Sequence, residues 1–134
     1  MNLVPSTYNG ASLQTANIYC KLAAQNLTTG ASANYVAAWD GSTWAPLGTG
    51  LNAHSFALAL YENKLIAGGE FSSAGGVNVS NIAAWNGSAW SALGTGTNNA
   101  VGTLTSFGNS LIAGGFFTTA GGDSVNYIAV WGPK

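Results

Sequence analysis

Short apolar runs alternate with glycine-containing turns along the whole chain. The runs are about four to eight residues long and rich in β-branched and aromatic types, and none shows the 3.6-residue period of an amphipathic helix. The pattern therefore predicts an all-β fold. The expected strands cover residues 35–39, 56–61, 64–69, 81–85, 101–107 and 110–115, with turns at Glu62-Asn63 and Gly108-Asn109.

Two hairpin turns are predicted at Asp40-Gly41 and Asn86-Gly87. A two-residue type I′ turn needs positive φ at both central residues, which these pairs adopt readily. With such a turn, Trp39 lies opposite Ser42, and Trp44 points to the same face as Trp39. We therefore expect each hairpin to carry an aromatic face that packs against another sheet.

The sequence repeats itself with a period of 46 residues. Trp39, Trp85 and Trp131 lie 46 positions apart. The same offset aligns Trp44 with Trp90, 47–50 with 93–96, 65–69 with 111–115, and 74–76 with 120–122. Repeats of roughly 20–50 residues are typical of solenoids, propellers and arrays.

Paired glycines are a second repeated feature. Gly68-Gly69 predicts a close backbone approach at which a Cβ would not fit, and Ala74-Gly75-Gly76 is interpreted as a flexible link to the next hairpin. A phosphate site is not favoured, because no helix N-terminus and no suitably placed lysine follow these glycines.

The combined motif resembles the kelch-like β-propeller blade. Four strands per repeat, a Gly-Gly doublet and a following tryptophan are closest to repeats of bacterial secreted propellers and fungal cortical-marker proteins, read here from Leu65 through Gly96 and again from Leu111 to Trp131. The resemblance implies blades of four antiparallel strands, usually non-catalytic and extracellular. About three blades fit in this chain, whereas closed propellers have about 4–8, so we expect oligomerisation to complete the ring.

The two ends of the chain depart from the repeat. Residues 1–33 are interpreted as a degenerate first blade or strand-exchange segment, and residues 34–134 as the propeller repeats. The last repeat, which reaches Trp131, is expected to lack its outermost strand. Because segment 8–12 loosely echoes the sequence around Trp85, we consider that the N-terminal segment supplies that strand, within the chain or to a neighbour.

Charged side chains are scarce, at 5% of the chain. Three lysines and no arginine cannot neutralise a series of phosphates, which argues against nucleic-acid partners. The single Cys20 excludes an internal disulfide, and no spacing suggests a metal or a cofactor. An enzyme is not expected, and its only candidate chemistry is His54 with Glu62 or Asp123. We also expect neither a signal peptide nor membrane insertion.

Two functional interpretations remain open. In the first, the chain is a non-enzymatic structural or interaction module that assembles with itself, a dimer being favoured, and is displayed outside the cytosol on a bacterial surface or a virion. Open sheet edges and tryptophan-rich faces would drive this assembly. Another structural protein is a further candidate partner. The residues assigned to blade packing and assembly are Trp39, Trp85 and Trp131.

The alternative is a multivalent lectin that binds surface glycans. Aromatic rings stack on sugars, amides bind hydroxyl groups, and repetition gives avidity. The candidate glycan contacts are Trp44, Trp90, Asn52, Asn98 and Asn99.

Overall fold

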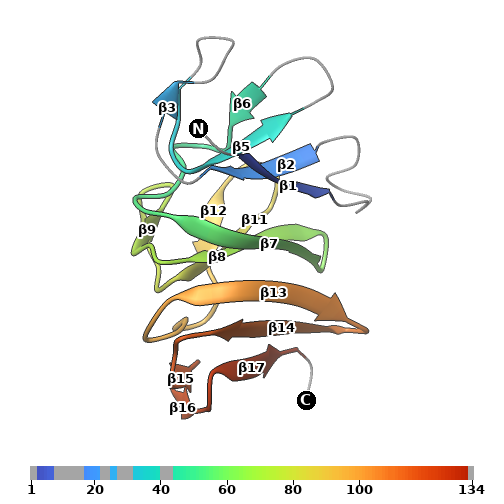
Figure 1. Ribbon diagram of the computed structural model, residues 1–134, viewed down its shortest axis with the longest axis vertical. Coiled ribbons are helices and arrows are strands. Elements are labelled where there is room, and N and C mark those ends of the chain that lie inside the picture. Colours follow the sequence, from blue (N-terminus) through green and yellow to red (C-terminus); the bar gives the residue numbers. More distant parts are fainter. Residues whose placement is uncertain (1–2, 8–16, 22–24, 27–31, 40–43, 133–134) are drawn as a thin grey trace.

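The computed structural model describes residues 3–7, 17–21, 25–26, 32–39 and 44–132, and these form an all-β structure without a helix. Three larger antiparallel sheets follow one another along the chain (Figure 1). The N-terminal sheet contains β1 (Leu3–Thr7), β2 (Asn17–Lys21), β5 (Val36–Trp39) and β6 (Trp44–Pro46). The middle sheet contains β7 (Ser55–Tyr61), β8 (Lys64–Gly69), β11 (Ile82–Trp85) and β12 (Trp90–Ala92). The C-terminal sheet contains β13 (Val101–Phe107), β14 (Ser110–Gly115) and β17 (Ile128–Trp131).

Three two-stranded hairpins accompany the larger sheets. They are β3 (Gln25–Asn26) with β4 (Ser32–Ala33), β9 (Ser73–Ala74) with β10 (Val77–Asn78), and β15 (Thr119–Ala120) with β16 (Asp123–Ser124). The Ala74-Gly75-Gly76 segment was expected to be a flexible link, and this was wrong. Gly75 and Gly76 have φ of 59° and 82° and form the turn between β9 and β10, in which Ala74 pairs with Val77.

The N-terminal segment contributes to the first sheet. β1 pairs with β2, and β2 pairs with β5, so these two N-terminal strands extend the sheet that contains β5 and β6. β1 is thus already paired within the N-terminal sheet and does not extend the C-terminal sheet, where β17 is the last strand described. The segment 8–12, considered as a source of that extra strand, lies outside the described residues.

The strand predictions are confirmed to within a residue or two, but the predicted register of the tryptophan hairpins was wrong. Trp85 lies opposite Trp90, so the loop has four residues instead of two. The side chain of Asn86 explains the longer loop, because its Oδ1 accepts hydrogen bonds from the backbone N–H groups of Ser88 and Ala89 at 2.8 and 2.9 Å. Trp39 likewise pairs with Trp44 and not with Ser42. Trp85 and Trp90 still share one face, since directly opposed residues do so.

The backbone follows the sequence period even where side chains differ. Tyr35, Asn81 and Tyr127 lie 46 positions apart, and all three have positive φ, at 69°, 67° and 67°. The N–H group of Gly69 donates to the carbonyl of Asn81, and that of Gly115 donates to the carbonyl of Tyr127, both at 3.0 Å. The repeat is therefore a repeat of conformation as well as of sequence.

The core consists of two clusters on opposite faces of the middle sheet. Along β11, Ala83 and Trp85 belong to the cluster shared with the N-terminal sheet, whereas Ile82 and Ala84 belong to the cluster shared with the C-terminal sheet. All four residues are buried. The middle sheet therefore has no solvent-facing side, and each neighbouring sheet covers one of its faces.

Gly68 sets how closely the middle and C-terminal sheets approach. A Cβ at this position would lie 2.6 Å from Cγ1 of Val101 and 3.1 Å from Cδ1 of Leu104, both on β13. The close approach that the Gly68-Gly69 pair predicts is thereby confirmed.

Replacing Gly68 with alanine tests this packing. We expect Gly68→Ala to lower the free energy of unfolding by about 1–3 kcal/mol, since the added methyl group must push two packed sheets apart. Gly102→Ala is the matched control, because a Cβ there has its nearest heavy atom at 3.8 Å. Chemical denaturation of both variants measures the difference, and equal stability of the two would contradict the packing described.

Candidate functional site

The outer face of the C-terminal sheet is apolar and open to solvent. Its residues correspond, at the 46-residue offset, to residues that the middle sheet buries. The three pairs with the largest contrast are Ile82 (4% exposed) and Ile128 (60%), Ala84 (2%) and Val130 (67%), and Tyr61 (6%) and Phe107 (75%). Ile112 lies between them, directly opposite Val130. We call Phe107, Ile112, Ile128 and Val130 the outer face.

This face differs from the one that the sequence suggested. Sequence reasoning expected tryptophan-rich faces to be exposed, whereas the outer face is aliphatic with one phenylalanine. Trp131 is adjacent to Val130 on β17, so it points to the opposite side of the sheet. The sequence does not distinguish the outer face, because its residues align with core positions of the middle sheet. The structure shows which of these positions are covered.

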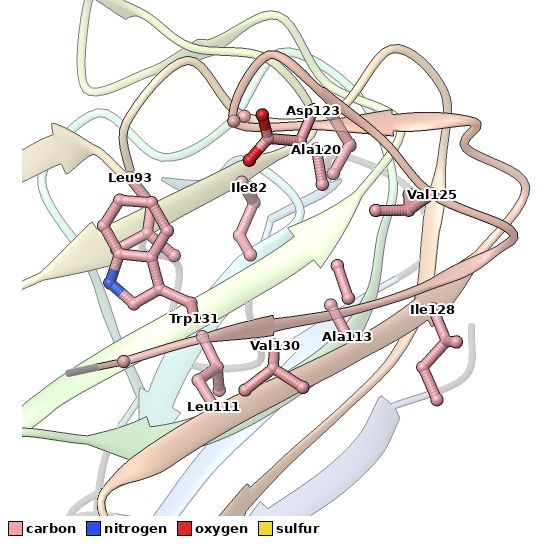
Figure 2. A pocket seen from close by; sticks show the side chains of 15 residues that line it. Ile82, Leu93, Leu111, Ala113, Ala120, Asp123, Val125, Ile128, Val130 and Trp131 are labelled. Carbon is pink, nitrogen blue, oxygen red and sulfur yellow. The ribbon is translucent and has the colours of Figure 1, made fainter. Parts of the chain in front are cut away.

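A pocket of about 560 Å³ lies beside β17, on the Trp131 side of the sheet (Figure 2). Its walls are mostly apolar and include Leu93, Leu111 and Trp131, which is 41% exposed. Asp123 brings a carboxylate to the lining. The pocket therefore suits an apolar or aromatic group better than a sugar, which needs several hydroxyl partners.

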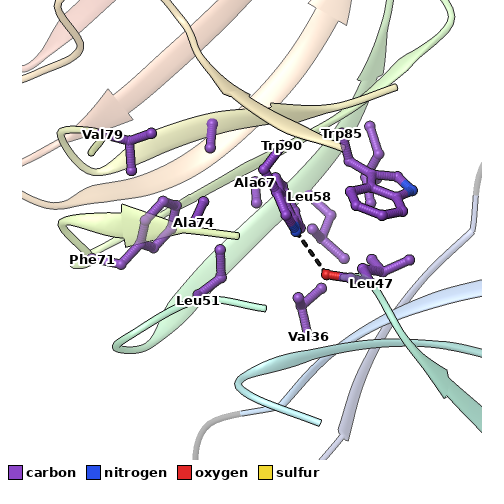
Figure 3. Packing of buried hydrophobic residues seen from close by; sticks show 12 residues of the cluster. Val36, Leu47, Leu51, Leu58, Ala67, Phe71, Ala74, Val79, Trp85 and Trp90 are labelled. Carbon is purple, nitrogen blue, oxygen red and sulfur yellow. Dashed lines mark hydrogen bonds between the residues drawn. The ribbon is translucent and has the colours of Figure 1, made fainter. Parts of the chain in front are cut away.

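Trp90 lies in the core of the middle sheet (Figure 3). It is 4% exposed, and its ring centroid lies 5.3 Å from that of Trp85. Its Nε1–H donates to the carbonyl of Leu47, 2.7 Å away, in the loop that follows the N-terminal sheet. Because the indole ring is buried against other side chains and its nitrogen is hydrogen-bonded, Trp90 presents no ring surface to a glycan. Trp85 is also buried.

Asn52 and Asn98 join loops of the protein itself. Oδ1 of Asn52 accepts hydrogen bonds from the N–H groups of Ser72 and Ser73 at 2.9 and 3.0 Å, and its Nδ2 donates to Oγ of Ser72. Asn98 makes the same three bonds with residues 118–119. This structural role explains why the asparagine recurs in both repeats. The side-chain amides of Asn52 and Asn98 are already hydrogen-bonded within the protein.

The described residues also show no ligand-binding arrangement at the other candidate glycan contacts. Oδ1 of Asn99 accepts a hydrogen bond from the N–H of Ala100 at 2.7 Å. Trp39 and Trp44 are backbone partners of β5 and β6, and their side chains lie outside the described part of the structure.

His54 pairs with Glu70 and not with Glu62 or Asp123. Its Nδ1 donates to Oε2 of Glu70 at 2.6 Å, and both side chains are exposed. The ring of Tyr35 meets the imidazole edge-on, with centroids 5.5 Å apart. Neither His54 nor Glu70 has a charged equivalent 46 residues later, where Ala100 and Phe116 stand.

The remaining electrostatics are sparse. Burial, with a smaller contribution from the neighbouring carboxylate of Glu62, raises the pKa of Tyr61. Within the described residues, no group of three or more His, Cys, Asp or Glu side chains is arranged to hold a metal ion. Among the described residues, there is no helix long and apolar enough to cross a membrane.

Neither the models of known protein families nor the curated proteins give a match to this sequence. The internal repeat is therefore the comparison that carries the functional argument.

The role of Trp90 can be tested by removing its N–H group while keeping an aromatic ring. We expect Trp90→Phe to lower the free energy of unfolding by about 2 kcal/mol, because the Leu47 carbonyl loses one of its two donors, the other being the N–H of Gly50, and ring contacts are lost. Trp131→Phe, at a partly exposed tryptophan that is the equivalent of Trp85, should cost less than about 1 kcal/mol. Urea denaturation compares the two, and a neutral Trp90→Phe would exclude the assigned bond.

Proposed function

We propose that this chain is a non-enzymatic structural module that assembles with further copies of itself into a β-propeller-type ring. Each larger sheet corresponds to one blade in this proposal. The 46-residue repeat, the four-stranded antiparallel order of two of the sheets and their stacking in sequence order support it.

The observation that carries the proposal is the exposure of the outer face. On the middle sheet, the equivalent positions are covered by the C-terminal sheet, which contributes Val101, Leu111 and Ala113 to the shared cluster. An apolar face of this kind on a protein surface marks an interaction site. A second copy provides sheets with the same repeat, so it is the partner whose chemistry fits.

The contact would be head-to-tail. The outer face belongs to the last sheet in the stack, and the surface it would meet belongs to the first sheet of the next copy. Contacts between two different surfaces give a ring when the rotation closes and a filament when it does not. Two chains would supply about six blades, within the usual range of closed propellers. We therefore propose a dimer.

The scarcity of charge supports this role and a location outside the cytosol, such as a bacterial surface or a virion. A formal net charge of −1 gives little repulsion between copies. A surface of uncharged polar residues also responds weakly to changes in salt and pH. The lectin alternative draws no support from the geometry, because Trp90, Asn52 and Asn98 are engaged within the chain.

Light scattering after size exclusion tests the assembly. We expect a discrete oligomer, with a dimer as the first candidate, and we expect Ile112→Lys to give a monomer because it places a charge at the centre of the outer face. Phe116→Glu is the matched control. It removes an exposed apolar residue at the position where the repeat has Glu70, and it should leave the oligomer intact.

Thermal unfolding of each variant verifies that the fold is retained. A wild-type chain that stays monomeric at all concentrations tested would overturn the proposal. Equal loss of the oligomer in Ile112→Lys and Phe116→Glu would also contradict it, since assembly would then not depend on the outer face.

A further inference from the structure

The pocket beside β17 corresponds to the place that Trp90 occupies in the preceding repeat. Gly121 is the equivalent of Gly75, and Leu93 is the equivalent of Leu47. A Cβ at Gly75 would lie 2.8 Å from Cδ1 of Trp90, whereas a Cβ at Gly121 would meet no heavy atom within 4 Å. Both Gly121 and Leu93 line the pocket. The pocket therefore lies at the position that the indole ring of Trp90 fills in the preceding repeat.

In the middle sheet the indole of Trp90 packs against Trp85, and the equivalent of Trp85 in the C-terminal sheet is Trp131. A Cβ at Gly48, in the loop after β6, would contact Cζ3 of Trp85 on β11 at 3.2 Å. A Cβ at Gly94, in the loop after β12, would contact Cη2 of Trp131 on β17 at 2.8 Å. Trp131 thus lies over Gly94 as Trp85 lies over Gly48. Trp131 therefore corresponds to Trp85, and the pocket corresponds to the position of Trp90.

The strand next to the pocket, β17, is the counterpart of β11 in the preceding repeat, and the two strands differ in how their edges are paired. β11 pairs with β12 on one side, through the partners Trp85 and Trp90, Ala84 and Ser91, and Ala83 and Ala92. β17 pairs with β14 on one side, and no described strand pairs with its other edge. Such an edge accepts an extended peptide through main-chain hydrogen bonds, while an adjacent pocket selects the side chain.

We propose that this pocket and the edge of β17 that no described strand pairs with form an acceptor site for an extended strand of another polypeptide that carries a tryptophan. The strand runs antiparallel to β17 and places its tryptophan opposite Trp131, with small residues opposite Val130 and Ala129. Its indole N–H donates to the carbonyl of Leu93, as Trp90 donates to Leu47.

The pocket also differs from its counterpart in one residue that influences specificity. Asp123 lies where the preceding repeat has Val77, and it contributes a carboxylate to the lining. Like charges across an interface are unfavourable, so the site disfavours an acidic strand. The segment 86–96 of this chain contains Trp90 and no charged residue, and it serves as the test ligand.

The experiment is a fluorescence anisotropy titration with a fluorescein-labelled synthetic peptide of residues 86–96. The protein carries Ile112→Lys, which lies outside the pocket lining and removes assembly through the outer face as a competing event. We expect saturable binding of this peptide, and binding at least about tenfold weaker for the same peptide with Trp90→Ala. Equal binding of the two peptides, or binding of neither, would overturn the proposal.

Protein variants locate the site. Trp131→Ala should weaken peptide binding at least about tenfold, whereas Phe116→Ser, an exposed position away from the pocket lining, should leave it unchanged. Thermal unfolding confirms that both variants are folded. Unchanged affinity in Trp131→Ala would place the peptide elsewhere and overturn the assignment.

The result is independent of the proposed assembly. Peptide binding together with a monomeric wild type would contradict the ring and support the acceptor site. An oligomer that Ile112→Lys disrupts, with no peptide binding, would support the ring and overturn the acceptor site.

Discussion

The absence of a solvent-facing side on the middle sheet is the constraint on which the rest of the structure depends. Residues 65–69 of β8 and all four residues of β11 are buried. Sheets that face water on one side alternate apolar and polar residues, and these strands do not. The middle sheet is therefore stable only between two other sheets.

Directional contacts fix how the sheets sit on one another. Apolar burial alone is non-directional and would allow neighbouring sheets to slide. The contact of Gly68 with Val101 sets the spacing between the middle and C-terminal sheets. The hydrogen bond from Trp90 to the Leu47 carbonyl holds the middle sheet to the loop that precedes it. Nδ2 of Asn81 donates to the carbonyl of Thr97 at 3.0 Å in the next connection. Each of these contacts joins segments that are distant in sequence.

The sequence predicts the strands and the period well because both depend on local patterns. The hairpin register could not be predicted in this way. Asn86-Gly87 favours a two-residue turn, but the Asn86 side chain caps the N–H groups of a longer loop, and Trp85 then lies directly opposite Trp90. The gain from packing two indoles together is a tertiary effect, and turn preferences do not include it. Gly75-Gly76 shows the same difficulty, since a pair of glycines suits a tight turn as well as a flexible link.

The candidate site was harder to predict, for a physical reason. A repeated polar residue such as Asn98 has the same pattern whether it binds a ligand or its own loops, and here it binds its own loops. An apolar residue such as Val130 likewise has the same pattern whether its face is covered or exposed. Within a repeat, the residues that fold one sheet are also those that bind the next. Folding and binding can therefore be separated only where the copies differ, as Phe116 differs from Glu70 and Asp123 differs from Val77. These positions, unlike the shared core residues, can change the surface of the last sheet without weakening the sheet itself.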